Sequence, residues 1–211
     1  MRLLALDGAL ARCSAAVWED GAVLAQAARD GAFGHAATLP ALAREVLAEA
    51  PGAPEAVAVT LGPGGFTGLR AALALARGLA LGWGVPCLGV TVGEALAATL
   101  ADAPERVWCA VDTKRGRIAL ERLGEAIPPA VFAEADLPAP PGPVTLVGDA
   151  APQAAARLLA RGFVARLADP RRPDAAQVAA VAAARRAAGL PDRPAEPMYL
   201  EPPAVRLPAG G

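Results

Sequence analysis

Gly62-Pro63-Gly64-Gly65-Phe66-Thr67-Gly68-Leu69-Arg70 is the stretch on which the fold of this chain depends. The apolar run 56–61 precedes it, and an alanine- and leucine-rich segment that reaches Trp83 follows it. This order predicts a strand, a glycine-rich turn and a helix. Because four of seven consecutive residues are glycine, the backbone can take positive φ angles and approach other segments closely. The stretch is therefore either a ligand loop or a joint between tightly packed elements.

The residue types in the stretch favour one of these alternatives. Thr67 is a candidate helix cap, and the free amides of the first helical turn would form a weak anion site. However, the stretch lacks the lysine and hydroxyl of a G-x-x-x-x-G-K-[ST] phosphate loop, and Thr67 stands at the third glycine of G-x-G-x-x-G. The sequence therefore favours the packing joint.

The composition argues against several classes of protein. The 211 residues carry a net charge of −1, so no global basic field draws the chain to nucleic acid or to an anionic membrane. Cys13, Cys87 and Cys109 are far apart and fit free thiols in a reducing compartment. The uncharged segment 78–93 is shorter than the roughly 18 apolar residues of a membrane span. We expect a soluble, cytoplasmic protein with no membrane contact.

Hydrophobic periodicity and turn residues predict the elements of the first half of the chain. The expected strands are 2–6, 13–19, 22–28, 56–61 and 87–91. The dipeptide Asp20-Gly21 predicts a tight hairpin between the second and third strands. The expected helices are 38–49, with Pro40 tolerated in its first turn, 69–83, and a third that begins near 92–94.

The second half repeats this order weakly. The expected strands are 107–112, 118–122, 144–147 and 163–167, and the expected helices are 152–161 and 174–188. A repeated βββαβα unit predicts two similar lobes, which we place at residues 1–103 and 104–190. The Pro-rich tail 191–211 is expected to be extended, and in part docked or disordered.

The helix expected at 69–83 is apolar around nearly its whole circumference. Its only charges are Arg70 and Arg77, which lie seven residues apart and so on one side. Such a helix must be covered on more than one side. Its sheet covers one face, and small residues such as Ala71 and Gly78 would let another helix approach a second face.

The chain offers few groups for catalysis. His35 is the only histidine, so the sequence predicts no metal site and no cofactor. Asp7, at the expected end of the first strand, could hold a metal-bound water near phosphates, although a turn-forming role is favoured. A Cys–His dyad stays open, although each cysteine lies in an apolar run where unreactive core thiols are the rule.

The chain resembles the TsaB (YeaZ) family. The resemblance rests on Leu3-Leu4-Ala5-Leu6-Asp7, the Asp20-Gly21 turn, His35 with Leu39-Pro40, and above all the stretch 62–70. It covers about the first hundred residues well and the rest loosely, through Val111-Asp112 and Pro197-Met198-Tyr199-Leu200. Two positions depart from the family pattern. Gly8 replaces a small hydroxyl residue, and Glu201 stands where an Arg commonly follows.

This resemblance implies a fold and a function. The implied fold is α/β, two-lobed and actin-like (ASKHA, ribonuclease H-like), in agreement with the duplicated βββαβα units. The implied function is that of a non-catalytic subunit in bacterial synthesis of N6-threonylcarbamoyladenosine at tRNA position 37. In this family the paralogue TsaD carries the metal, on a pair of histidines, and transfers the threonylcarbamoyl group. TsaE supplies an ATPase, and tRNA is reached only through the complex.

Because the helix 69–83 is apolar nearly all round, we hypothesise a partner surface on the helices 38–49 and 69–83, with burial of that helix beneath the second lobe as the alternative. We expect this surface to bind TsaD, or a second copy of the chain when it is isolated, and not to contain catalytic residues. The predicted interface residues are His35, Leu39, Leu42, Val46, Leu73, Ala76, Arg77 and Ala80.

Three other interpretations stay open at this point. One is an active ATPase or kinase of the same fold, with Asp7, Asp112 and Asp149 around a nucleotide in what is otherwise a degenerate cleft. Another is a peptidase, which the single histidine makes a poor fit. The third is a homodimeric scaffold with other partners.

Overall fold

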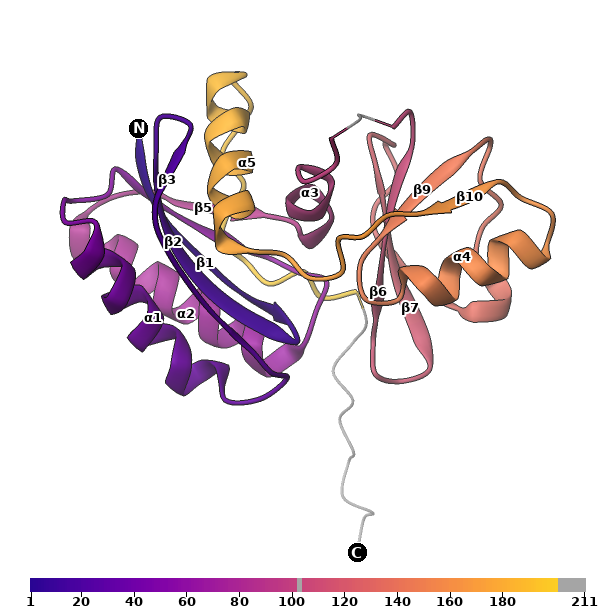
Figure 1. Ribbon diagram of the computed structural model, residues 1–211, viewed down its shortest axis with the longest axis horizontal. Helices are drawn as coiled ribbons and strands as arrows, with labels where there is room; N and C mark the ends of the chain where they lie inside the picture. The colour runs from indigo at the N-terminus through magenta and orange to yellow at the C-terminus, as the bar shows by residue number, and fades with distance from the viewer. Residues whose placement is uncertain (102–103, 201–211) are drawn as a thin grey trace, which may run out of the picture.

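Two five-stranded sheets of the same topology lie side by side in the chain (Figure 1). The computed structural model describes residues 1–101 and 104–200. The strand order is β3-β2-β1-β4-β5 in the first sheet and β8-β7-β6-β9-β10 in the second. In both, two antiparallel hairpins are followed by two parallel strands. The duplicated, two-lobed architecture predicted from the sequence is therefore confirmed.

The first half of the chain forms eight elements. They are β1 (Arg2–Leu10), β2 (Arg12–Glu19), β3 (Ala22–Asp30), α1 (His35–Glu49), β4 (Ala56–Thr60), α2 (Phe66–Trp83), β5 (Cys87–Val90) and α3 (Val92–Ala97). The predicted turn between β2 and β3 is present, with positive φ at both Asp20 and Gly21. The first strand is longer than predicted, because β1 continues past Asp7 through an irregularity in its pairing with β2.

The second half forms seven elements and one short 3₁₀ turn. They are β6 (Val107–Asp112), β7 (Arg117–Leu123), β8 (Ala130–Ala133), η1 (Glu134–Asp136), β9 (Val144–Val147), α4 (Ala151–Ala160), β10 (Ala165–Leu167) and α5 (Ala175–Ala187). The sequence did not predict β8, a four-residue edge strand that is only half-buried. Where the first half has helix α1, the second has only η1.

Helices α1 and α2 both begin three residues earlier than predicted. Gly34 and Gly65 are their N-caps, and neither offers a side chain to the first turn. Thr67 is therefore inside α2, and its predicted capping role is wrong. Pro40 is the sixth residue of α1 and not in its first turn. Glycine caps leave no Ser, Thr or Asp signal in the sequence, which is why both starts were misplaced.

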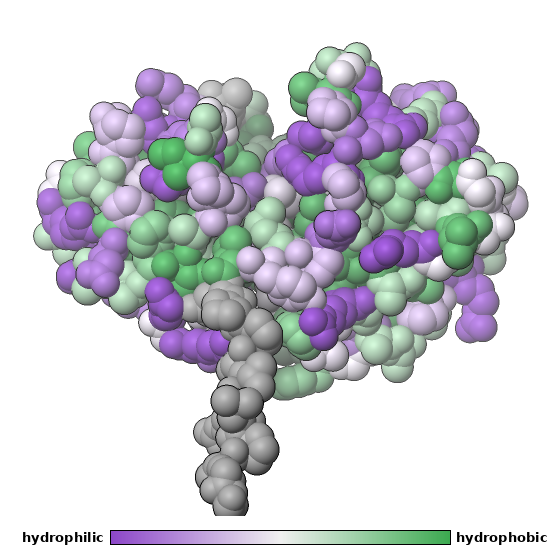
Figure 2. All heavy atoms as spheres, turned by 180° about the vertical axis from the view of Figure 1, so that it is seen from behind, coloured by the Kyte–Doolittle hydropathy of each residue, from purple (hydrophilic) through white to green (hydrophobic). Residues whose placement is uncertain are grey.

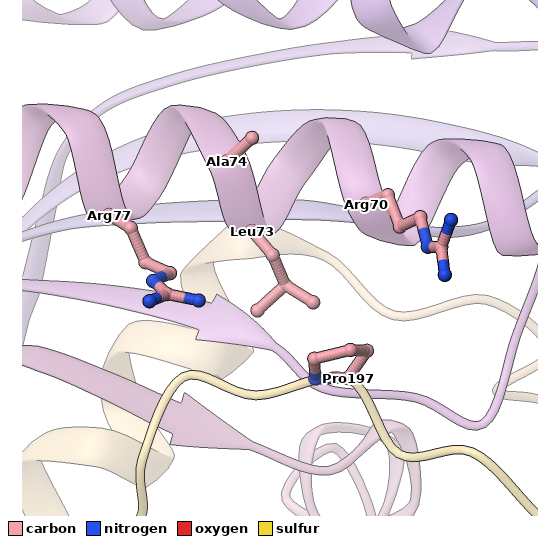
Figure 3. A pocket seen from close by; sticks show the side chains of 5 residues that line it. All are labelled: Arg70, Leu73, Ala74, Arg77 and Pro197. Atoms are coloured by element: carbon pink, nitrogen blue, oxygen red, sulfur yellow. The ribbon is translucent and has the colours of Figure 1, made fainter.

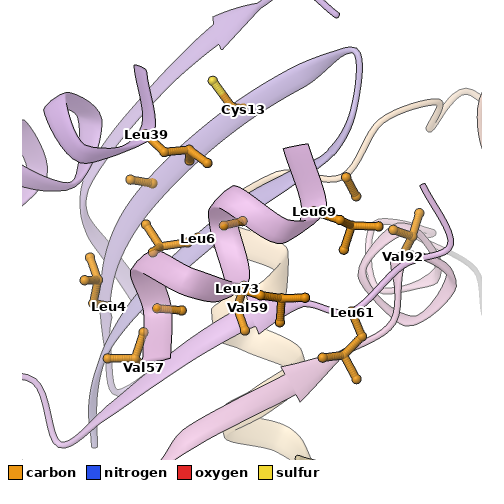
Figure 4. Packing of buried hydrophobic residues seen from close by; sticks show 14 of the residues in the cluster. Leu4, Leu6, Cys13, Leu39, Val57, Val59, Leu61, Leu69, Leu73 and Val92 are labelled. Atoms are coloured by element: carbon orange, nitrogen blue, oxygen red, sulfur yellow. The ribbon is translucent and has the colours of Figure 1, made fainter. Parts of the chain in front are cut away.

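The first sheet is buried on both faces. Leu4 and Leu6 on β1 face the same cluster as residues of α1 and α2, such as Leu39 and Leu69 (Figure 4). Their neighbours Leu3 and Ala5 point to the opposite face. This alternation follows from the period of two along a strand. A sheet covered on both faces explains why β1 reads as a nearly continuous apolar run.

The last helix of each half crosses to the other sheet. Helix α5 packs on β1, β2, β4 and β5 of the first sheet, on the face opposite α1 and α2, and α3 lies between the lobes against β6, β7 and β9 (Figure 1). The sequence predicted 174–188 in the second lobe. That helix instead covers the first sheet, because Val178, Ala179 and Ala182 bury their apolar face against Leu3 and its neighbours.

The described part of the tail is docked. The Gly89 amide of edge strand β5 donates to the Arg193 carbonyl at 2.8 Å, and the Met198 amide donates to the Leu61 carbonyl at 2.8 Å. Residues up to Leu200 thus follow the open edge of the first sheet, which would otherwise present unpaired backbone groups. The rest of the predicted tail, including Glu201, lies outside the described residues.

Candidate functional site

The glycine-rich stretch packs directly against the end of strand β1. A Cβ added at Gly64 would overlap the Ala9 carbonyl oxygen, and one added at Gly68 would overlap the Gly8 carbonyl oxygen and the His35 ring. The Gly65 amide donates to the Ala9 carbonyl at 2.7 Å. Side chains at these positions would push α2 away from the sheet. This is the geometry of a packing joint between β1 and α2.

Gly8 is the matching position on the strand. A Cβ there would lie 2.9 Å from the Gly68 carbonyl oxygen and 3.3 Å from the Ala72 Cβ. The departure from the family pattern at Gly8 thus coincides with the closest approach of α2. A hydroxyl-bearing residue would need room that this joint does not leave.

His35 completes the joint at the start of α1. Its ring is buried, with Nδ1 3.2 Å from the Gly8 carbonyl oxygen and Nε2 2.9 Å from the Gly31 carbonyl oxygen. Both nitrogens therefore face backbone acceptors. The only histidine of the chain ties α1 to β1 and to the loop before α1, and neither ring nitrogen points to an open ligand position.

Asp7 is fully buried within β1. Its Oδ1 accepts hydrogen bonds from the Thr60 hydroxyl at 2.7 Å and from the Ala9 amide at 3.2 Å, whereas its Oδ2 has no partner among the described residues. Burial raises the pKa of Asp7 from its ordinary value of 3.8 to about 7.

Asp112 and Asp149, two of the three residues predicted around a cleft, lie side by side in the second lobe. The Lys114 ammonium lies 2.9 Å from Asp112 Oδ2 and 3.5 Å from Asp149 Oδ2. The Asp112 amide also donates to Asp149 Oδ1 at 2.9 Å. Burial acts to raise the pKa of Asp112, but the hydrogen bonds and charge of Lys114 outweigh it and lower that pKa. Lys114 thus forms ion pairs with both carboxylates.

The three predicted cleft residues do not form one cluster. Asp7 bonds to Thr60 and Ala9, whereas Asp112 and Asp149 bond to each other and to Lys114. Nor do any three His, Cys, Asp or Glu side chains within residues 1–101 and 104–200 gather as a metal-binding group.

The cysteines are poorly suited to nucleophilic attack. Burial raises the pKa of Cys109 well above its ordinary value and that of Cys87 to about 11. Burial also raises the pKa of Cys13. Since the thiolate is the nucleophile, these environments argue against the Cys–His dyad.

Sequence reasoning missed a buried carboxylate cluster at the junction of the lobes. Glu121 of β7 accepts a hydrogen bond from the Gly93 amide at 3.2 Å, and burial raises its pKa to about 7. Glu94 beside it pairs with Arg185 of α5 and with Arg193 of the tail, each through a 3.0 Å contact. The signal for Glu121 was a carboxylate directly after the apolar run Ile118-Ala119-Leu120, at an inward-facing position of the strand.

The predicted interface residues are mostly core. Only Arg77 is exposed; the seven others are buried against the sheet, namely His35, Leu39, Leu42, Val46, Leu73, Ala76 and Ala80. Apart from Leu73, which also borders a surface groove, these side chains face the core of their own lobe, because the apolar stripe of an amphipathic helix packs on its own sheet first. The outward side of the same helices is formed by other residues.

That outward side holds a shallow apolar groove of about 460 Å³ between the two helices. Its lining residues are Pro40, Ala43, Arg44, Leu47, Ala48, Leu75 and Leu79. Beside it on α2, Gly78 and Gly82 are exposed, and a Cβ at either would meet nothing within 4 Å. On the face opposite that of Figure 1, hydrophobic and hydrophilic residues are interspersed over both lobes (Figure 2).

Comparisons with known proteins agree with this geometry. A family model described as "TsaD: tRNA N6-adenosine threonylcarbamoyltransferase" matches residues 27–139. The chain belongs to this family. Its relatives include the tRNA threonylcarbamoyladenosine biosynthesis protein TsaB of Escherichia coli, with 33% identity over 126 residues. That match covers 56% of this chain and 53% of the relative, so it spans about half the length of that curated protein.

Solved structures extend the similarity over the whole chain. YeaZ from Pseudomonas aeruginosa is 27% identical, with a TM-score of 0.76 over 94% of this chain and 100% of its own. A second P. aeruginosa structure, described as similar to peptidase YEAZ, reaches a TM-score of 0.78 at 27% identity, over 95% of this chain and 99% of its own. The predicted membership in the TsaB (YeaZ) family is therefore confirmed.

A more distant structure shows the fold alone. The ethanolamine utilization protein EutJ from Carboxydothermus hydrogenoformans is 13% identical, with a TM-score of 0.52 over 85% of this chain and 89% of its own. With the duplicated sheet order, this likeness confirms the predicted actin-like, two-lobed α/β fold. Among the described residues, no helix has both the length and the apolarity needed to cross a membrane.

Proposed function

We propose that this protein is a non-catalytic subunit of the machinery that forms threonylcarbamoyladenosine at tRNA position 37. It binds and supports the transferase TsaD together with the ATPase TsaE, and it meets tRNA only through that complex. The cytoplasm, where tRNA is modified, is the expected compartment. The proposal draws on the likeness to E. coli TsaB and to the YeaZ structures.

The observation that carries the non-catalytic role is the state of the cleft residues. Lys114 neutralises Asp112 and Asp149 at 2.9 and 3.5 Å. Asp7 is buried with Thr60, and the ring nitrogens of His35 face backbone carbonyls. Asp7 Oδ2 is the one of these atoms without a partner among the described residues, and Asp7 is fully buried. These arrangements support a role as a binding partner and not as a catalyst.

The partner surface that we propose is the outward side of α1 and α2. Exposed Gly78 and Gly82 stand beside the apolar groove lined by Leu47, Leu75 and Leu79. Small residues on a helix next to a groove allow close packing of a second helix. A TsaD protomer, or a second copy of this chain when it is isolated, fits this surface.

Reconstitution with TsaD, TsaE and tRNA from the same organism, with threonylcarbamoyl adenylate as the group donor and ATP, tests the function. We expect threonylcarbamoyladenosine to form only when this chain is present, and a mixture that works equally well without it would exclude the proposal. Magnesium-dependent ATP binding by the isolated protein would favour the ATPase alternative.

One variant tests the surface. Gly78→Arg places a long side chain in open space on α2, so it should leave the monomer folded and reduce binding to TsaD. Arg166→Glu on exposed β10 is the control away from this surface. Unchanged TsaD binding by a folded Gly78→Arg protein would place the interface elsewhere.

A further inference from the structure

A second groove, of about 400 Å³, lies between α2 and the chain that follows α5. Its walls are Arg70, Leu73, Ala74 and Arg77 from α2, and Pro197 from the tail. Leu73 points toward Pro197, and the two arginines project on either side of it (Figure 3). The groove thus has an apolar floor between two cations.

The tail wall of this groove is fixed in place. Next to Pro197, the Met198 amide donates to the Leu61 carbonyl at 2.8 Å. Further back, Arg193 pairs with Glu94 at 3.0 Å and its carbonyl accepts from the Gly89 amide at 2.8 Å. These contacts hold residues 193–198 against the edge of the first sheet, so the groove is already formed in the folded chain.

Arg70 is held in one orientation. Its guanidinium carbon lies 3.6 Å from the centre of the Phe66 ring, and its Nε donates to the Tyr199 hydroxyl at 2.8 Å. Both rings remain about half exposed, at 52% and 54%. A cation fixed between two aromatic rings loses little side-chain entropy when it meets a ligand, and Arg with exposed aromatics is typical of binding hot spots.

Arg77 completes the charge pattern. It is exposed, and within the described parts of the chain it forms no ion pair. Helix α2 contains no acidic residue, so Arg70 and Arg77 are its only charges. Two cations seven residues apart project about 10 Å apart along the helix axis. Their complement is one or two carboxylates, and the complement of Leu73 and Pro197 is an apolar side chain.

We propose that this groove docks an apolar segment of a partner protein that carries one or two carboxylates. The carboxylates pair with Arg77 and the free guanidinium nitrogens of Arg70, and the apolar side chain covers Leu73 and Pro197. Residues 197–199 are then part of the recognition surface and not only a cover for the sheet edge. The inference rests on the proposed function, since it takes TsaD as the partner.

Charge variants at Arg77 test the proposal by association kinetics with TsaD from the same organism. We expect Arg77→Glu to weaken binding about tenfold at low salt, mainly through a slower association rate, and Arg77→Lys to stay within about threefold of wild type. Arg166→Glu, the same charge change on β10, should have no effect. Equal affinities of wild type and Arg77→Glu would overturn the proposal.

The tail is tested by a second pair of variants. Tyr199→Ala removes the ring and the hydroxyl that orient Arg70, whereas Tyr199→Phe keeps the ring. We expect a loss of about fivefold for the first and about twofold for the second, with thermal unfolding unchanged for both. Equal binding by the two variants and wild type would remove the tail from the recognition surface.

The outcomes separate the two levels of inference. Wild-type protein that does not bind TsaD contradicts the proposed function itself. Wild-type binding that Arg77→Glu does not weaken contradicts only the groove, and binding that Tyr199→Ala does not weaken removes only the tail from it. A loss of tRNA binding in Arg77→Glu, with TsaD binding intact, would assign the groove to nucleic acid and overturn the protein-docking proposal.

Discussion

Asp7 places a carboxyl group in the core with one oxygen unpartnered, and this has a consequence for stability. Its pKa rises from 3.8 to about 7 in the folded chain because burial penalises the charged form. Between these two values the unfolded chain releases a proton that the folded chain keeps. The stability contributed by Asp7 therefore falls as the pH rises through this window, by up to about 1.4 kcal/mol per pH unit, and is level above it.

We expect Asp7→Asn to remove this pH dependence. Asn keeps an acceptor for the Thr60 hydroxyl and has no charged form. Relative to wild type, the variant should gain about 2 kcal/mol of unfolding free energy between about pH 5 and about pH 7.5. Urea unfolding at both pH values measures it, and the similar contribution of Glu121 cancels because both proteins carry it. Parallel pH profiles would show that Asp7 ionises normally.

Gly68 in the stretch 62–70 and Gly78 further along α2 differ in what surrounds them. At Gly68 an added methyl group would overlap the Gly8 carbonyl oxygen, which belongs to the backbone and cannot rotate away, whereas at Gly78 it meets nothing within 4 Å. We expect Gly68→Ala to cost about 2 kcal/mol or more and Gly78→Ala to be neutral or to stabilise by about 0.5 kcal/mol, since alanine favours the helix. Chemical denaturation measures the unfolding free energy of both variants. Equal effects would contradict the tight packing of Gly68 against β1.

The residue types predicted the close packing at the glycine-rich stretch but not which residues of α1 and α2 are buried. The four glycines predicted a close backbone approach, and that prediction needed only their spacing. Predicting which residues of α1 and α2 lie on the outer surface was harder, because an apolar residue such as Leu42 or Ala76 occurs both in cores and in interfaces. Burial assigned these residues to the core, and no pattern in the sequence distinguishes the two.

At the scale of elements, the order of strands and helices along the chain was largely predictable and the helix ends were not. The Asp20-Gly21 turn and the alternating apolar runs predicted the hairpins. The starts of α1 and α2 were misplaced because their N-caps, Gly34 and Gly65, carry no capping side chain. Strand β8 was missed because it is short and half-buried. The early start of α1 also places a proline in its interior.

Pro40 should be a source of instability in α1. At the sixth position it lacks the amide that would bond to the carbonyl four residues earlier, and such a proline costs about 3 kcal/mol relative to alanine. Pro40 also lines the groove between α1 and α2, so lost contacts offset part of the gain. We expect Pro40→Ala to raise the unfolding free energy by about 1–2 kcal/mol in urea. A destabilised variant would mean that the ring's packing outweighs the missing hydrogen bond.

At the scale of the whole molecule, each lobe is completed by a helix from the other half of the chain. Helix α5 covers the face of the first sheet that carries Leu3 and Ala5, and α3 covers the second sheet. The start of α5 is fastened to β2, where the Ala175 amide donates to the Ser14 hydroxyl at 2.9 Å. Apolar periodicity predicts a helix there but not which sheet it covers, so this exchange was beyond the sequence.

Because α5 covers the first sheet, a substitution that destabilises α5 should also destabilise the first lobe. Ala179 is fully buried against the first sheet, whereas Ala184 on the same helix is exposed. Ala179→Asp buries a carboxylate without a partner, so we expect a loss of about 3 kcal/mol or more, and Ala184→Asp should cost less than about 1 kcal/mol. Hydrogen exchange should show the Ala179→Asp loss of protection in β1, β2 and β4, although the substitution lies more than a hundred residues away in the chain. Protection lost in β6, β7 and β9, with the first sheet unchanged, would mean that the lobes follow the halves of the sequence and that the helices do not exchange.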